Sequence, residues 1–131
     1  MRMTARLPWP PSTNSLYRAG SGMNQRYLTA TARKYRGEVL KALMEQGIRR
    51  EQCEERLSVL LEVSGPTSGR YDRFDIDNRI KAVLDALEHC GVFMDDEQVD
   101  MLIATRAPRT PDGFVQVSIR SESDHGEVLQ S

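Results

Sequence analysis

The spacing of apolar residues switches repeatedly between a helical and a strand-like period, and this alternation restricts the fold more than any other feature of the chain. Helical spacing marks two segments, 29–46 and 78–90, and strand-like spacing marks four, 2–7, 56–64, 97–106 and 114–120. The order β-α-β-α-β-β predicts an α+β fold of two layers, in which a mixed sheet carries both helices on one face. The sequence RTPDG at 109–113 predicts a hairpin between the last two strands.

The length of 131 residues suits one domain, placed at residues 1–121 and followed by an acidic, polar C-terminal tail at 122–131. No apolar run approaches the roughly 20 residues that cross a bilayer, and the N-terminus lacks the apolar stretch of a secretory signal. The two cysteines, Cys53 and Cys90, are not spaced as CxxC and suit a reducing compartment. We therefore expect a cytoplasmic protein with no membrane partner.

Opposite charges are concentrated in the two halves of the chain. Residues 1–50 hold ten Lys and Arg and two acids, whereas residues 51–131 hold eight Lys and Arg and seventeen acids. The basic half suggests a polyanionic partner, unless folding mixes the two halves and cancels the field. Nine of the seventeen acids lie between Asp72 and Asp100, a concentration that points to a site in that segment.

Acidic residues surround the start of the second predicted helix. If the backbone is extended just before that helix, Asp75 and Asp77 point to the same side and Ile76 turns toward the core. Within the helix, residues four apart share a face, so Asp77, Lys81 and Asp85 form a polar row. Two carboxylates and one ammonium thus converge at the helix start.

These acidic residues predict a site for a divalent cation. Neighbouring carboxylates repel each other unless a cation lies between them or one is protonated, and hard oxygen ligands favour Mg²⁺ or Mn²⁺. Asp95 or Asp96 would supply a third ligand if the chain returned along the helix, within one subunit or across a dimer. The alternatives are that Asp77 only caps the helix and that residues 95–97 form a solvated turn.

Three motifs, in this order, resemble those of a known family. They are LPWPPSTN at residues 7–14 with Tyr17 nearby, DIDNRIK at 75–81 followed by DAL at 85–87, and GVFMDDEQV at 91–99. Together they resemble the RusA family of Holliday-junction resolvases, which are small endonucleases common in prophages. The resemblance runs from about Leu7 to Ile119, and its second and third motifs are the specific ones.

The resemblance implies a metal-dependent endodeoxyribonuclease that resolves four-way (Holliday) DNA junctions in recombination or repair. It also implies a homodimer, because two sites related by a two-fold axis match the symmetry of a junction that needs paired cuts. The catalytic, metal-binding aspartates of the family correspond to Asp75, Asp77 and Asp96, with Mg²⁺ as the cofactor and Mn²⁺ as a substitute. The essential lysine of the family corresponds to Lys81.

Further residues are assigned around this core. Asn78, Asp85 and Asp95 would surround the metal ligands; Asn78 would hydrogen-bond a carboxylate or a metal-bound water, or only begin the helix. The residues expected to contact DNA phosphates are Arg18, Arg26, Arg33, Lys34, Arg36 and Arg73.

Two other functions stay open on the sequence. A non-catalytic protein that binds junction or duplex DNA would keep the fold and the basic residues, with the acids serving the dimer or the helix cap. A metal-dependent nuclease acting on other branched DNA or on RNA would use the same chemistry. The segment GRYDRF at 69–74 has fewer basic residues than the arginine-rich run of the family and an added acid, a departure that concerns junction affinity more than catalysis.

Overall fold

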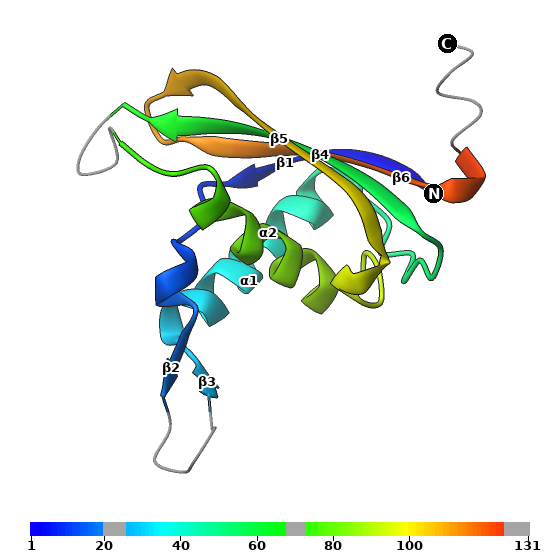
Figure 1. The fold of residues 1–131 in the computed structure, drawn as a ribbon, viewed down its shortest axis with the longest axis horizontal. Coiled ribbons are helices and arrows are strands. Elements are labelled where there is room, and N and C mark those ends of the chain that lie inside the picture. Colours follow the sequence, from blue (N-terminus) through cyan, green and yellow to red (C-terminus); the bar gives the residue numbers. More distant parts are fainter. Residues whose placement is uncertain (20–25, 68–72, 125–131) are drawn as a thin grey trace.

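The computed structural model describes residues 1–19, 26–67 and 73–124, and its main body is a mixed four-stranded sheet with two helices on one face (Figure 1). This confirms the predicted α+β fold of two layers. The strands of the sheet are β1 (Arg2–Pro8), β4 (Leu57–Pro66), β5 (Val99–Thr110) and β6 (Phe114–Ser121), and the helices are α1 (Ala30–Glu45) and α2 (Asp77–His89). Among the described residues, none of the helices combines the length and apolar character needed to span a membrane.

The predicted hairpin between the last two strands is wrong. The sheet order is β1-β6-β4-β5, so β6 pairs antiparallel with both β1 and β4, while β5 pairs parallel with the other side of β4. The reason is burial: every second side chain of β6 is buried, whereas β5 is mostly exposed, so β6 lies inside the sheet and β5 at its edge. The connection between them crosses the end of β4 at Gly113, whose φ is 72° and where a Cβ would lie 2.9 Å from Pro66 Cδ.

Helix α2 presents one apolar face to the core between the two layers. The buried side chains of this face are Ala82, Val83, Leu84, Ala86 and Leu87, and Arg79 is also buried. Lys81, Asp85 and Glu88 follow the helical period on the opposite face, which is polar. The packing of α2 therefore fixes which of its charged side chains can form a site.

Two short strands, β2 (Tyr17–Ala19) and β3 (Arg26–Leu28), were not predicted from the sequence. They pair antiparallel in a ribbon that projects from the helix layer (Figure 1). Strands of three residues are too short for a period of two to show in the sequence. Residues 20–25, which connect the two strands, lie outside the described residues.

The segment assigned to the C-terminal tail begins as a 3-10 helix, η4 (Glu122–Asp124). The backbone N–H of Ser123 donates to the Glu55 carboxylate at 3.2 Å, and Asp124 forms an ion pair with the N-terminal ammonium of Met1. These contacts hold residues 122–124 against the end of the sheet. Residues 125–131 of the tail lie outside the described part of the chain.

Candidate active site

Asp75 and Asp77 lie in a tight turn that leads into α2, and the extended backbone predicted for this segment is wrong. The Asn78 N–H donates to the Asp75 carbonyl at 3.2 Å, and Ile76 has helical angles, φ −58° and ψ −47°. Residues two apart in helical backbone point roughly 200° away from each other around the axis. The argument that placed Asp75 and Asp77 on one side, with Ile76 turned to the core, therefore does not hold.

The predicted polar row on α2 is present around Lys81. Its Nζ lies 3.0 Å from Asp85 Oδ1, four residues later, and 3.2 Å from Asp96 Oδ2. The hydrogen bond to Asp85 and then that to Asp96 raise the pKa of Lys81, while partial burial lowers it. Asp85 is only 14% exposed and also accepts a hydrogen bond from the Tyr17 hydroxyl at 3.2 Å. Lys81 is thus a fixed ammonium between two carboxylates.

Three carboxylates gather beside this lysine. Ligand oxygens of Glu88, Asp95 and Asp96 all lie within 4.8 Å of one another, and the Asp96 N–H donates to Glu88 Oε1 at 2.8 Å. Glu88 was missed from the sequence, although it lies three residues after Asp85 on the same helix face. Carboxylate oxygens at this spacing are the donor set that Mg²⁺ or Mn²⁺ takes.

The short 3-10 helix η3 (Asp96–Gln98) holds the acidic loop in place. Asp95 Oδ1 accepts from the Glu97 N–H at 2.9 Å, and the Gln98 side chain accepts from the Asp95 N–H at 2.8 Å. The other end of the Gln98 amide donates to the Cys53 carbonyl at 2.8 Å. Asp96 therefore projects from a loop whose backbone is held by hydrogen bonds, while its neighbours Asp95 and Glu97 are exposed to solvent.

The structure brings together only part of the predicted metal site. Within one chain the loop returns far enough for Asp96 to contact Lys81. Among the described residues, the group of three carboxylates contains Asp96 and Asp95 but neither Asp75 nor Asp77. Asp77 and Glu88 lie eleven residues apart on α2, about 16 Å along its axis. The set Asp75, Asp77 and Asp96 remains a prediction.

Aromatic and cationic side chains anchor the turn that carries Asp75. The Arg106 guanidinium lies 4.4 Å from the centre of the Phe74 ring and donates to the Phe74 carbonyl at 2.6 Å. Phe74 packs edge-on against Trp9, with ring centres 4.9 Å apart, and Arg79 lies over the other ring, 5.1 Å from the centre of Trp9. This stack links β5, α2 and the proline-rich loop, residues 9–15, and so sets the position of the residue before Asp75.

The close approach of Phe74 to Gly65 supplies a test of this anchoring. A Cβ at Gly65 would lie 2.4 Å from the Phe74 ring, so Gly65→Ala is expected to displace the ring and cost about 1–3 kcal/mol of unfolding free energy. Urea denaturation measures that loss. The matched control is Gly37→Ala, an exposed position in α1 with open space around its Cβ, where the same change should stabilise the protein by up to about 1 kcal/mol. Equal stability of the two variants would show that Phe74 is not held in this way.

Asn78 contacts the proline-rich loop. Its side-chain oxygen accepts from the Thr13 N–H at 3.2 Å, and the Thr13 hydroxyl donates to the Asn78 carbonyl at 3.1 Å. These bonds dock the loop onto the start of α2. They give Asn78 a role in joining two elements that the sequence did not suggest, and its assignment near the metal ligands stays a prediction.

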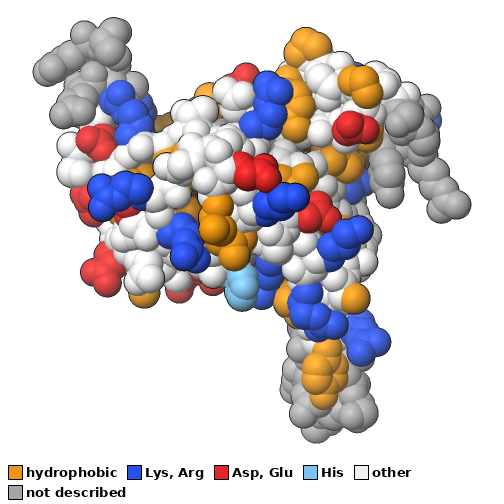
Figure 2. Space-filling view, turned by 180° about the vertical axis from the view of Figure 1, so that it is seen from behind, with side chains coloured by type: hydrophobic (Ala, Val, Ile, Leu, Met, Phe, Trp, Pro, Cys, Tyr) orange, Lys and Arg blue, Asp and Glu red, His pale blue; other side chains and the backbone are white. Residues whose placement is uncertain are grey.

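The residues predicted to contact DNA are distributed over several elements. Arg18 lies on β2, and Arg26 on β3 with its side chain outside the described part. On α1, Arg33 donates to the Leu28 carbonyl at 2.7 Å, and Lys34 pairs with Glu38 at 4.0 Å. Arg36, also on α1, has its Nη1 3.4 Å from His89 Nδ1. Arg73 is exposed just before Phe74. Figure 2 shows basic side chains around the base of the β2–β3 ribbon, in keeping with a basic surface there.

The family model and the curated relatives indicate one family. The model of the family described as "Endodeoxyribonuclease RusA" matches residues 8–120. A crossover junction endodeoxyribonuclease of Enterobacteria phage HK97 is 33% identical over 117 residues, covering 86% of this chain and 89% of the relative. One from Escherichia coli strain K12 is 31% identical over 117 residues, with the same coverage of both chains. A solved structure, the periplasmic domain of Helicobacter pylori MotB, covers 97% of this chain and 84% of its own at 15% identity, but its TM-score of 0.38 is too low for any inference.

Proposed function

The chain belongs to the RusA family of endodeoxyribonucleases, and from this membership we propose that it resolves four-way DNA junctions by hydrolysing phosphodiester bonds in two strands. The observation that supports this most directly is the contact of Lys81 with Asp96 beside Glu88 and Asp95. An ammonium and several carboxylates at one point of the surface are the groups that metal-assisted phosphodiester hydrolysis needs. We propose that the protein acts in the cytoplasm, in recombination or repair.

The carboxylates fit a divalent cation, which we propose to be Mg²⁺, with Mn²⁺ as a substitute. Asp96 is common to the ligand set implied by the family, with Asp75 and Asp77, and to the group with Glu88 and Asp95. We propose the first set as the ligands. When bound, the metal lowers the pKa of a water and neutralises charge on the phosphate.

The side chains around the metal ligands have separate roles in this proposal. Lys81 donates hydrogen bonds to the scissile phosphate and stabilises the charge that develops on its oxygens. Asp85 accepts hydrogen bonds from both Lys81 and Tyr17. Tyr17 therefore holds Asp85 in place, and Asp85 holds Lys81. The Glu88 carboxylate accepts a hydrogen bond from the Asp96 N–H and so fixes the direction of the Asp96 carboxylate.

We propose that two copies pair along β5 to give the two sites that paired cuts require. β5 is one of the two outer strands of the sheet, and its Met101, Leu102 and Ile103 are exposed. An open apolar edge strand pairs readily with another strand. An antiparallel pairing centred on Ile103 would oppose Asp100 of each copy to Arg106 of the other, a favourable arrangement of charge although Asp100 already pairs with Arg56 and Arg106 binds the Phe74 carbonyl within each copy.

The proposed function is tested with a labelled four-way junction and the full chain. In Mg²⁺ we expect two nicks at symmetric positions, loss of cutting when EDTA removes the metal, and recovery with Mn²⁺. A duplex of the same sequence and a branched RNA serve as controls. Tight junction binding without cutting in either metal would favour a binding protein, and preferential cutting of RNA would favour a different nuclease.

A further inference from the structure

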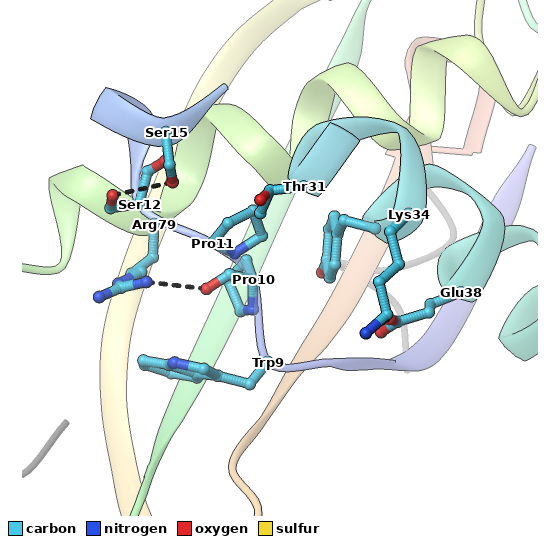
Figure 3. Close-up of a pocket in the computed structure, with 10 residues that line it drawn as sticks. Trp9, Pro10, Pro11, Ser12, Ser15, Thr31, Lys34, Glu38 and Arg79 are labelled. Atoms are coloured by element: carbon cyan, nitrogen blue, oxygen red, sulfur yellow. Dashed lines mark hydrogen bonds and ion pairs between the residues drawn. The ribbon is translucent and has the colours of Figure 1, made fainter. Parts of the chain in front are cut away.

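A pocket lies between the proline-rich loop, the start of α1 and the start of α2 (Figure 3). Its volume is about 430 Å³, within the range of small-ligand sites. In Figure 3, Trp9, Pro10 and Pro11 form one wall, and Thr31 and Lys34 come from α1 on the other side. The catalytic proposal makes no use of this pocket.

The walls of the pocket are fixed by hydrogen bonds and by proline. Tyr35 donates from its hydroxyl to the Pro8 carbonyl at 2.8 Å, and the buried Arg79 donates to the Pro10 carbonyl at 2.9 Å. The Arg79 guanidinium also lies over the Trp9 ring. Since proline restricts the loop further, the pocket is preformed and a ligand would meet little ordering cost.

The pocket offers donors and acceptors next to flat apolar surfaces. The hydroxyls of Ser12 and Ser15 lie 3.1 Å apart on one side, and the Lys34 ammonium lies 4.0 Å from the Glu38 carboxylate on the other. The Thr31 hydroxyl adds a further donor and acceptor. A nucleotide matches this combination: its base has a flat face and both donors and acceptors, and its phosphate accepts from hydroxyl and ammonium groups.

The pocket adjoins the proposed catalytic turn. Asn78 and Arg79, which directly follow Asp77, are the residues that bind the proline-rich loop. Arg79 lines the pocket and follows Asp77 by two residues in the first turn of α2, so the pocket adjoins the start of the helix that carries Asp77.

We propose that this pocket binds one unpaired nucleotide of the branched DNA substrate, with its base against Trp9 and the prolines and its phosphate near Lys34 and Thr31. This inference rests on the proposed function. Base pairs at a branch point are the easiest to open, so removing a base from the stack costs least there. The pocket thereby distinguishes branched from continuous duplex DNA.

The main test fills the pocket with Thr31→Leu. Thr31 is exposed in the first turn of α1, and leucine is a good helix former, so folding should be preserved. We expect junction affinity to fall about tenfold while duplex affinity stays unchanged. Abasic sites at the branch should weaken binding of the unaltered protein by the same factor. They should have little further effect on binding by Thr31→Leu, because the abasic site and the substitution remove the same contact between base and pocket.

A charge pair on α1 supplies a matched control. Lys34 and Lys41 are 80% and 78% exposed, and each pairs with a glutamate four residues later, at 4.0 Å and 3.9 Å. Lys34 lines the pocket, and Lys41 does not. Lys34→Gln should reduce the salt dependence of junction binding by about one phosphate contact, and Lys41→Gln should leave it unchanged.

The outcomes separate this inference from the proposed function. If the unaltered protein cuts junctions and Thr31→Leu binds them equally well, the pocket assignment is overturned and the function stands. Equal loss of duplex and junction affinity, or no effect of abasic sites on the unaltered protein, also overturns it. If the unaltered protein neither binds nor cuts junctions, both proposals fall.

Discussion

Asp96→Asn is expected to slow junction cleavage by roughly 1,000-fold, a rise of about 4 kcal/mol in the barrier, while junction affinity stays within about threefold. Asp96 belongs to both candidate ligand sets and contacts Lys81. Asparagine keeps the shape of the side chain and removes the charge that a metal ligand needs. Single-turnover cleavage in Mg²⁺, with binding measured in parallel without metal, checks the prediction.

Two companion variants decide which set holds the metal. If Asp75, Asp77 and Asp96 are the ligands, Asp75→Asn should reduce the cleavage rate as much as Asp96→Asn does. Glu88→Gln keeps the oxygen that accepts from the Asp96 N–H, so it should then reduce the cleavage rate by less than about tenfold. The reverse order would assign the metal to Glu88, Asp95 and Asp96. Full activity of Asp96→Asn would contradict both sets.

Lys81→Met is expected to reduce cleavage by roughly 100- to 1,000-fold with little change in junction affinity. The lysine is fixed between Asp85 and Asp96, so its charge is held where the phosphate must bind. Because these bonds raise its pKa, Lys81 stays protonated up to a pH above the usual range for lysine, and its deprotonation should leave no step in the pH profile near neutrality.

Lys81→Arg separates charge from geometry. Arginine keeps the positive charge but has a planar, larger head group, so we expect Lys81→Arg to restore the cleavage rate only in part. The measurement is the cleavage rate at saturating junction for the three proteins. If Lys81→Met cuts at the unaltered rate, Lys81 forms only a surface ion pair, whose loss costs at most about 1 kcal/mol of stability.

The local features of the fold were predictable from the sequence, and the long-range ones were not. The period of two in β6 and the helical period of α2 reflect side chains on one element, so the elements were found. The RTPDG turn does reverse the chain, but a turn says nothing about which strand lies next to β6. Which strands flank β6 depends on how deeply the side chains of each strand are buried, and only the complete sheet determines that burial.

In the candidate site, too, the contacts within one element were predictable from the sequence and those between distant segments were not. Lys81 and Asp85 lie on one helix, so their contact followed from the helical period. The turn at Asp75 is instead shaped by Phe74 packing against Trp9, 65 residues earlier in the chain. The partnership of Glu88 with Asp96 depends on the path of a loop that Gln98 fixes by binding the Cys53 carbonyl. Such contacts have no period that a sequence could display.

The inner position of β6 has a consequence for how this chain folds. Within the described part of the chain, the first strand pairs with the last alone, with Arg2 opposite Arg120, and β4 gains its antiparallel neighbour from the same late segment. During synthesis, β1 and β4 therefore emerge long before the strand that must lie between them. Closing so long a loop is entropically costly, and folds with such distant pairings form slowly. The helices and the acidic loop can form early, but the sheet that supports them closes only after residue 121 is released.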